Sequence, residues 1–260
     1  MSQDRRRGLA GPYSGCACAA ADTTHPARRA RMPGYRTQQA RIAITGAADL
    51  HIRSLLDRQQ FSDPEGAAEA LGVSSAAWPL FGLVWPSALH LAARLALHPL
   101  QPGQRVLEIG CGLALASLVA HRRGMDVTAS DKHPLAAAFL AHNLRLNRLP
   151  PMAYRHGEWA LPARAGPLDG ARWTGAVHGR YGLLVASDVL YEREAGVLLA
   201  GFIGRHALPQ AEVWVVDPDR GNRGPLQRGL AAQGFVAAAE EKLGAPGSGY
   251  KGRLLRFIRG

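Results

Sequence analysis

Two glycines and a carboxylate in residues 105–131 have the types and spacing that could bind a nucleotide. Gly110 and Gly112 follow the apolar run 106–109, and Asp131 closes a second expected strand, 126–130, about 20 residues later. Glycine has no Cβ atom, so these positions permit a tight turn and let a ligand lie against the backbone at a helix N-terminus. The carboxylate can accept hydrogen bonds from ribose hydroxyls. The expected nucleotide contacts are Gly110, Cys111, Gly112, Asp131 and Lys132.

Glu108, two residues before the first glycine, indicates which nucleotide would bind. A pyrophosphate brings negative charge to the turn, and a neighbouring carboxylate would repel it. Leu115 also stands where a dinucleotide-binding turn carries its third glycine. A ligand with a sulfonium and an ammonium group would be attracted instead. We therefore expect S-adenosylmethionine (SAM), with S-adenosylhomocysteine (SAH) as product, and Glu108 among the contacts. The alternative is a glycine turn that binds nothing.

The ordered pattern E-x-G-x-G, followed by an acid that closes the next strand, resembles motif I and post-motif I of the class I, seven-β-strand SAM-dependent methyltransferases. The resemblance implies an α/β fold, a three-layer αβα Rossmann-like sandwich around a mostly parallel seven-stranded sheet. Residues 235–243 and 250–258 flank a Gly/Pro/Ser turn and are expected to form the C-terminal antiparallel hairpin of this fold.

Asp188 and Tyr191 form a second group with chemical potential, directly after the apolar run 181–187. Ligands of open parallel sheets bind outside the carboxyl ends of the strands, so this D-x-x-Y should face the same crevice as the glycine turn. Asp188 and Tyr191 are the candidate catalytic residues, and Ser187 is expected to contact the cofactor. The alternative is that Asp188 caps the next helix and Tyr191 packs in the core.

Together with the glycine turn and Trp85-Pro86, D-x-x-Y resembles methyltransferase family 16 over about residues 75–258. That branch contains many protein-lysine methyltransferases, so the resemblance implies methyl transfer from SAM to a protein lysine. The sequence has no [DN]PP[YF] element, which many nucleic-acid amino-methyltransferases carry, and this makes nucleic acid a disfavoured substrate. A small-molecule methyltransferase on the same fold and a SAM-binding module without turnover are the alternatives.

Three more residues are expected at the cofactor. The ring face of Trp85 could rest against a sulfonium or methylammonium by cation–π attraction, or it could anchor a helix in the core. Glu158 and Trp159 follow the third expected strand. In the class I fold this loop meets the adenine, so Glu158 could accept from the amino group and Trp159 could cover the ring. Both could equally be ordinary loop residues.

Apolar runs and helix-capping residues predict the elements that must position these groups. Strands are expected at 106–109, 126–130, 152–156, 181–187 and 211–217. Helices are expected at 86–97, 113–123, 134–147, 192–208 and 225–233. The loop 218–224 carries two arginines at the carboxyl end of a strand, and is either a solvated turn or a border of the substrate entrance.

The N-terminal part divides into two segments. Residues 1–40 lack sustained periodicity, are rich in Arg, Ala, Gly and Pro, and carry +5 of the net charge of +11, so we expect a disordered basic extension. Translation from Met32 is a further hypothesis. Residues 41–75 are expected to form a hairpin around Gly46 and a short helix, ahead of a methyltransferase domain at 76–260.

The amino-acid composition limits the compartments and partners that we expect for the protein. The three cysteines form neither a disulfide framework nor a zinc site, which favours a reducing cytoplasm and no metal. No apolar run reaches membrane-spanning length. Abundant Arg, Ala and Gly with scarce Lys is typical of a GC-rich bacterial genome, which weakens any inference of nucleic-acid binding from the charge. A basic protein still favours an acidic protein partner.

Overall fold

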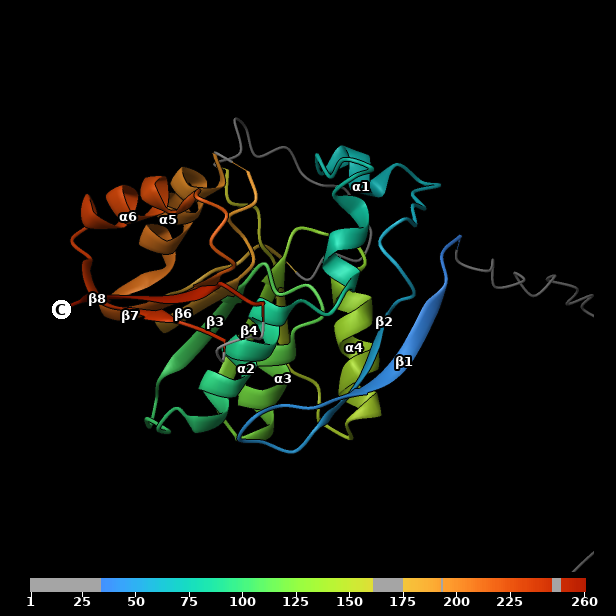
Figure 1. The fold of residues 1–260 in the computed structure, drawn as a ribbon, viewed down its shortest axis with the longest axis horizontal. Helices are drawn as coiled ribbons and strands as arrows, with labels where there is room; N and C mark the ends of the chain where they lie inside the picture. Colours follow the sequence, from blue (N-terminus) through green and yellow to red (C-terminus); the bar gives the residue numbers. More distant parts are fainter. Residues whose placement is uncertain (1–33, 161–174, 193, 245–248) are drawn as a thin grey trace, which may run out of the picture. The chain divides into compact units, whose positions relative to one another are not determined.

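The computed structural model describes residues 34–160, 175–192, 194–244 and 249–260. Its main sheet contains β3 (Arg105–Ile109), β4 (Asp126–Asp131), β5 (Ala153–His156), β6 (Tyr181–Ser187), β7 (Ala207–Asp217), β8 (Val236–Lys242) and β9 (Arg253–Arg259). These seven strands lie in the order β5-β4-β3-β6-β7-β9-β8 (Figure 1). Strands β3 to β7 pair in parallel, and β9 runs antiparallel to both β7 and β8. The predicted mostly parallel sheet and its terminal hairpin are confirmed.

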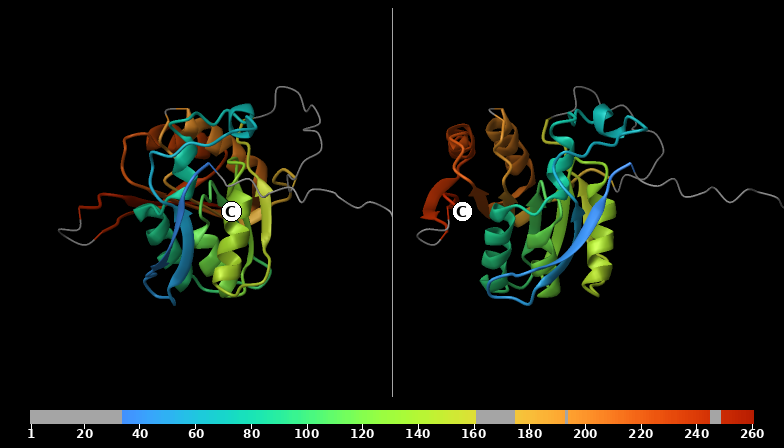
Figure 2. Two further views of the ribbon diagram at one scale, coloured as in Figure 1. Left: turned by 90° about the vertical axis from the view of Figure 1, so that its right-hand side faces the viewer. Right: turned by 45° about the vertical axis from the view of Figure 1, so that its right-hand side comes forward.

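Helices cover both faces of this sheet (Figures 1 and 2). One layer holds α2 (Pro86–Leu97), α3 (Leu115–Arg122) and α4 (Ala136–Leu146), and the other holds α5 (Ala195–His206) and α6 (Arg223–Ala231). Side chains alternate across a strand, so Leu183 and Val185 of β6 pack in the core of the first layer. Their neighbours Leu184 and Ala186 pack in the core of the second. A continuous apolar run therefore marked a strand buried on both faces.

The strand order places a crevice at the carboxyl ends of β3 and β6. From β3 the chain proceeds to β4 and β5 on one side, and then crosses to β6 and β7 on the other. Open α/β sheets bind ligands at such a switch point, because the loops after the two central strands diverge there. The two sequence motifs follow β3 and β6, so the fold brings them to one place.

A two-stranded hairpin precedes the main sheet. β1 (Thr37–Ile42) pairs antiparallel with β2 (Leu50–Leu55), and Gly46 in the connection has a φ of +80°. The predicted hairpin is confirmed, but β1 lies partly inside the range 1–40 that we expected to be an extension. Its sequence TQQARI is polar and its side chains are largely exposed, so no apolar alternation marked it.

A short helical segment links the hairpin to α2. It contains α1 (Ala67–Ala70) and the single-turn helix η1 (Trp78–Gly82). The Asp63 carboxylate accepts a hydrogen bond from the backbone N–H of Glu69 at 2.9 Å, as expected of a helix-capping residue. Among the described residues, no helix combines the length and the apolar character needed to cross a membrane.

The hairpin lies beside α4 (Figure 2), and two asparagine side chains of the α4 region join the two elements. Asn143 Oδ1 accepts the N–H of Arg53 at 2.8 Å. Asn147 Oδ1 accepts the N–H of His51 at 2.9 Å, and its Nδ2 donates to the carbonyl of His51 at 2.7 Å. Residues four apart on a helix lie on one face, so both amides meet the free edge of β2 as a neighbouring strand would.

Asn143→Ala is expected to lower the free energy of unfolding by about 2 kcal/mol, because it leaves the N–H of Arg53 without an acceptor at a buried contact. Asn143 is 0% exposed. Urea denaturation measures the effect, with Arg145→Ala on the exposed side of the same helix as control. An Asn143→Ala midpoint equal to that of the control would refute the role of this contact.

Candidate active site

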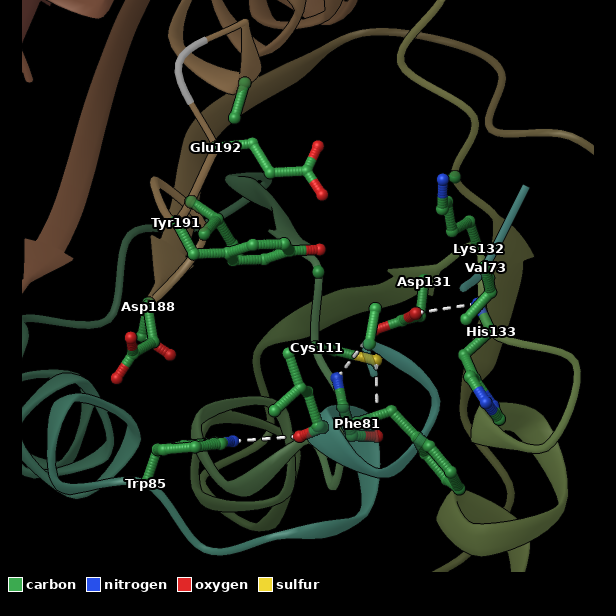
Figure 3. A pocket seen from close by; sticks show the side chains of 18 of the residues that line it. Val73, Phe81, Trp85, Cys111, Asp131, Lys132, His133, Asp188, Tyr191 and Glu192 are labelled. Carbon is green, nitrogen blue, oxygen red and sulfur yellow. Dashed lines mark hydrogen bonds between the residues drawn. The ribbon is translucent and has the colours of Figure 1, made fainter. Parts of the chain in front are cut away.

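A cavity of about 340 Å³ lies at the carboxyl ends of the central strands (Figure 3). Its walls come from the loops that follow β3, β4, β5 and β6, and from the segment between the hairpin and α2. The volume falls in the range of about 300–1,000 Å³ that small-molecule sites occupy. Nearly all the predicted site residues line it: Trp85, Gly110, Cys111, Gly112, Asp131, Lys132, Glu158, Trp159, Ser187, Asp188 and Tyr191.

The glycine turn is shaped by contacts within the protein as well as by its backbone conformation. Gly110 and Gly112 have φ values of +64° and +51°, which L side chains rarely adopt. A Cβ atom on Gly112 would lie 2.7 Å from the carbonyl oxygen of Phe81, and one on Gly110 would lie 2.8 Å from Val189 Cγ1. Ala114 also has a positive φ, +59°, so α3 starts at Leu115, later than expected. The absence of a Cβ atom at Gly110 and Gly112 therefore lets Val189 and Phe81 pack directly against the turn.

Asp131 is held by backbone donors on both carboxylate oxygens. Oδ2 accepts the N–H of Gly112 and Oδ1 accepts the N–H of His133, both at 2.8 Å. The bond from Gly112 ties the end of β4 to the glycine turn, and the bond from His133 shapes the loop directly after β4. Burial raises the pKa of Asp131 above its ordinary value. Each carboxylate oxygen has a second lone pair and Asp131 lines the cavity, so it can still accept the predicted hydrogen bonds from ribose hydroxyls.

Glu108 does not line the cavity, in contrast to our expectation. It is 1% exposed, and its carboxylate accepts the N–H of Ser117 at 2.8 Å and also the Ser117 hydroxyl. The cause is the alternation of side chains along β3, which sends Leu107 and Ile109 into the core beneath α5 and α6 and Glu108 toward α3. Glu108 therefore fixes the first turn of α3 rather than meeting a ligand.

Glu108→Gln is expected to reduce the pH dependence of stability. Burial, reinforced by the negative charge of Asp131, raises the pKa of Glu108 from 4.5 to about 7 in the folded protein. Between these values the folded state binds more protons than the unfolded state, so stability falls as the pH rises. The loss from this group is at most about 3 kcal/mol, and glutamine, which cannot ionise, removes it.

Urea denaturation at pH 5 and pH 8 measures this difference for the wild type and Glu108→Gln. The exposed Glu65→Gln serves as the control for a lost surface carboxylate. Equal pH dependence in the wild type and Glu108→Gln would contradict the assignment.

Asp188 lies at the end of β6 and is held in place by side chains from two other elements. Its Oδ2 accepts a hydrogen bond from Ser87 Oγ at 3.0 Å, and its Oδ1 pairs with Arg220 Nη1 at 2.5 Å. Ser87 Oγ also lies 2.8 Å from the hydroxyl of Tyr250. Helix α5 begins only at Ala195, so Asp188 does not cap it. Its carboxylate faces the cavity and is anchored by side chains from α2 and from the loop after β7.

Tyr191 stands at the cavity mouth rather than in the core. It is 46% exposed. Partial burial, with the carboxylates of Asp131 and Glu192 nearby, raises the pKa of its phenol to about 12. Figure 3 shows its hydroxyl pointing across the cavity, toward the side of Asp131 and Lys132. The phenol therefore keeps its proton at neutral pH and can donate a hydrogen bond.

The predicted aromatic and acidic loop residues lie in the cavity wall. Trp85 Nε1 donates to the carbonyl of Leu80 at 2.8 Å, which fixes the indole at the start of α2. Glu158 Oε1 accepts the N–H of Ala160 at 3.1 Å, and Trp159 packs against the core beneath α5 and α6. Their contacts with adenine or sulfonium remain predictions.

Sequence reasoning missed one whole wall of the cavity. It is formed by residues 72–83, among which Phe81 stacks on His133 with ring centroids 3.7 Å apart. Burial lowers the pKa of His133 to about 3, so this imidazole is neutral and extends the apolar wall. Val73 and Phe81 lie on this same wall, so the expected domain boundary between residues 75 and 76 divides it. The dense aromatic run WPLF at 78–81 was the available signal.

The ionisable side chains of the cavity wall are predominantly acidic. Four carboxylates and two long-chain cations line it: Asp131, Glu158, Asp188 and Glu192 against Lys132 and Arg220. Such a wall attracts a ligand that carries positive charge and repels a polyphosphate. The acidic balance, the glycine turn and Asp131 fit SAM better than a dinucleotide.

Comparison with known proteins gives distant relatives of one chemical class. No family model matches the chain. It is 29% identical over 141 residues to the histone-arginine methyltransferase METTL23 of Homo sapiens, covering 50% of this chain and 67% of that one. It is 28% identical over 145 residues to the electron transfer flavoprotein beta subunit lysine methyltransferase of Xenopus laevis, covering 55% of this chain and 53% of the relative.

Solved structures share the fold. The magnesium protoporphyrin IX methyltransferase ChlM of Synechocystis, with bound SAM, superimposes with a TM-score of 0.51 at 17% identity, covering 66% of this chain and 78% of that chain. A methyltransferase from Pyrococcus furiosus gives 0.51 at 21% identity, covering 74% and 97%. Sequence relatives and fold thus agree with the motifs that surround the cavity: the chain has the fold of the class I SAM-dependent methyltransferases and is similar in sequence to methyltransferases of that class.

Proposed function

We propose that the protein is a SAM-dependent protein N-methyltransferase whose acceptor is a lysine side chain. The observation that carries the proposal is the pair Asp188 and Tyr191 at the mouth of an acidic cavity. The protonated amine of an acceptor lysine, which must lose a proton before attack, would find a carboxylate there, beside an aromatic surface. The relationship to a lysine methyltransferase at 28% identity supports the same acceptor.

The residues that would hold SAM are those of the glycine turn and the loops beside it. Asp131 would accept from the ribose hydroxyls, Glu158 and Trp159 would meet the adenine, and Trp85 would lie near the sulfonium. When bound, SAM supplies a methyl group that is already activated for direct displacement. The protein then needs to align the acceptor and exclude water.

The acceptor lysine needs a specific environment, because its amine has a reference pKa of about 10.4 and is protonated at neutral pH. Desolvation by Trp85 and Tyr191 favours the neutral amine. Asp188 orients the ammonium group and stabilises the leaving proton. Tyr191, which stays protonated, can hydrogen-bond the amine or the backbone that carries it but cannot act as a base near pH 7.

The partner is an acidic protein of a bacterial cytoplasm, in keeping with the net charge of +11. The relatives named above act on proteins, one on arginine and one on lysine according to their names. A third relative, the ribosomal protein L11 methyltransferase of Thermosipho africanus, is 36% identical over 73 residues, 26% of this chain and 28% of that one.

Calorimetry with SAM, SAH and NAD, followed by labelled-methyl transfer from SAM to host lysate, tests the proposal. We expect binding of SAM and SAH, no binding of NAD, and label on lysine in the protein fraction. Label in the metabolite fraction would favour a small-molecule acceptor. SAM binding with no transfer to any fraction would favour a binding module, and NAD binding would overturn the assignment of the cofactor.

A further inference from the structure

The carboxylate of Asp188 already forms an ion pair with the guanidinium of Arg220 in this structure. Arg220 Nη1 lies 2.5 Å from Asp188 Oδ1, and both residues line the cavity. The Asp188 side chain is 10% exposed, whereas that of Arg220 is 41% exposed. The cation therefore approaches from the solvent side, which is the side open to an incoming acceptor.

The loop that carries Arg220 is fixed by a separate set of ion pairs. Asp219, with a φ of +68°, pairs with Arg253 at 3.2 Å and with Arg223 at 3.4 Å. Both arginines also bind Glu240 of β8 at 2.7 Å. The backbone beside Arg220 is thus held to the terminal hairpin, and Arg220 itself pairs with Asp188. The side chain can leave Asp188 without release of the loop.

The orientation of Asp188 does not depend on Arg220. Ser87, which is 0% exposed, donates to the other carboxylate oxygen and lies 2.8 Å from the hydroxyl of Tyr250. Asp188 N–H donates to the carbonyl of Val216 at 2.9 Å, which holds the backbone to β7. What Arg220 occupies is the free face of the carboxylate, where a cationic acceptor would bind.

We propose that Arg220 is a specificity-determining residue whose guanidinium stands in for the cation of the methyl acceptor and must be displaced by it. The inference rests on the proposed function for the identity of that cation, an alkylammonium. An acceptor must offer Asp188 a cation in exchange for Arg220. Neutral and anionic groups cannot make this exchange, because they would leave the guanidinium in place.

Binding of n-butylammonium to the full-length protein, followed by NMR or by tryptophan fluorescence, tests this, with n-butanol as the neutral probe. Arg220→Gln should bind n-butylammonium about fivefold more tightly than the wild type, because the competing cation is gone. Arg220→Lys should stay near the wild type. Arg228→Gln removes the same charge on the exposed side of α6 and should change nothing. The double variant Asp188→Asn/Arg220→Gln should not show the tighter binding of n-butylammonium that Arg220→Gln shows alone.

The variant Arg220→Gln also separates this inference from the proposed function. If lysine is methylated, Arg220→Gln should lower the KM for the acceptor. Weaker or unchanged n-butylammonium binding in folded Arg220→Gln, or a raised KM, overturns the stand-in role and leaves the lysine assignment intact. Tighter n-butylammonium binding without methylation of any lysine supports the stand-in role and removes the proposed function.

Discussion

We expect the substitution Gly110→Arg to abolish SAM binding. The backbone at this position has a φ of +64°, and its Cβ would lie 2.8 Å from Val189 Cγ1 and 3.6 Å from Trp159. A long side chain there has to enter the cavity, because the protein side is already in contact. We expect no heat of SAM binding at concentrations that saturate the wild type.

The matched control is Gly175→Arg, since a Cβ at Gly175 meets nothing within 4 Å. Circular dichroism of both variants separates loss of binding from loss of fold. Should Gly110→Arg fail to fold, Gly110→Ala answers the question, because its single methyl meets a side-chain atom, Val189 Cγ1, rather than backbone. We expect at least a tenfold weaker SAM affinity for Gly110→Ala, roughly the effect of 1.4 kcal/mol of strain. Wild-type affinity in a folded Gly110→Arg would place the cofactor elsewhere.

Asp188→Asn should lower kcat by about a hundredfold or more while SAM affinity changes little. Asparagine keeps the size of the side chain, can accept from Ser87, and tolerates the φ of +59° that this position has. Alanine would add backbone strain to the loss of charge, so asparagine is the cleaner test. The effect comes from the lost negative charge that orients the acceptor ammonium.

Methyl-transfer kinetics and SAM calorimetry on the same preparation measure the two expected effects. Asp126→Asn is the control, because Asp126 lies at the opposite end of β4 and pairs with Arg105 at the surface. An unchanged kcat in Asp188→Asn would move the catalytic role to another residue. A parallel loss of SAM affinity would assign Asp188 to the cofactor instead.

Local signals accounted for most of the fold. Apolar runs predicted β6 at its observed bounds, and the pattern from 106 to 131 predicted the strands that flank α3, observed as β3 and β4. The orientation of Glu108 was also within reach, because the apolar neighbours Leu107 and Ile109 must share a face that Glu108 cannot. The position of Glu108 in the strand is therefore a better guide to its partner than its charge.

Local signals could not place two features of the site, although the aromatic run 78–81 marked one of them. The wall at residues 72–83 meets the glycine turn through Phe81, which also stacks on His133, and these contacts between remote parts of the chain depend on tertiary packing alone. The pairing of Arg220 with Asp188 likewise depends on how the loops after β6 and β7 converge. A spacing rule describes one turn of the chain, whereas these contacts depend on the assembled sheet.

The asparagine contacts between the hairpin and α4 imply an order of assembly during synthesis. Arg53 bonds with a side chain 90 residues later, and His51 with one 96 residues later. The hairpin therefore leaves the ribosome long before its docking helix exists, and closure of this long loop is entropically costly. Phe81 and its neighbours follow the hairpin in the chain and wall the cavity. A nascent chain thus acquires its capacity to bind SAM late in folding, after α4 has formed and captured the N-terminal strands.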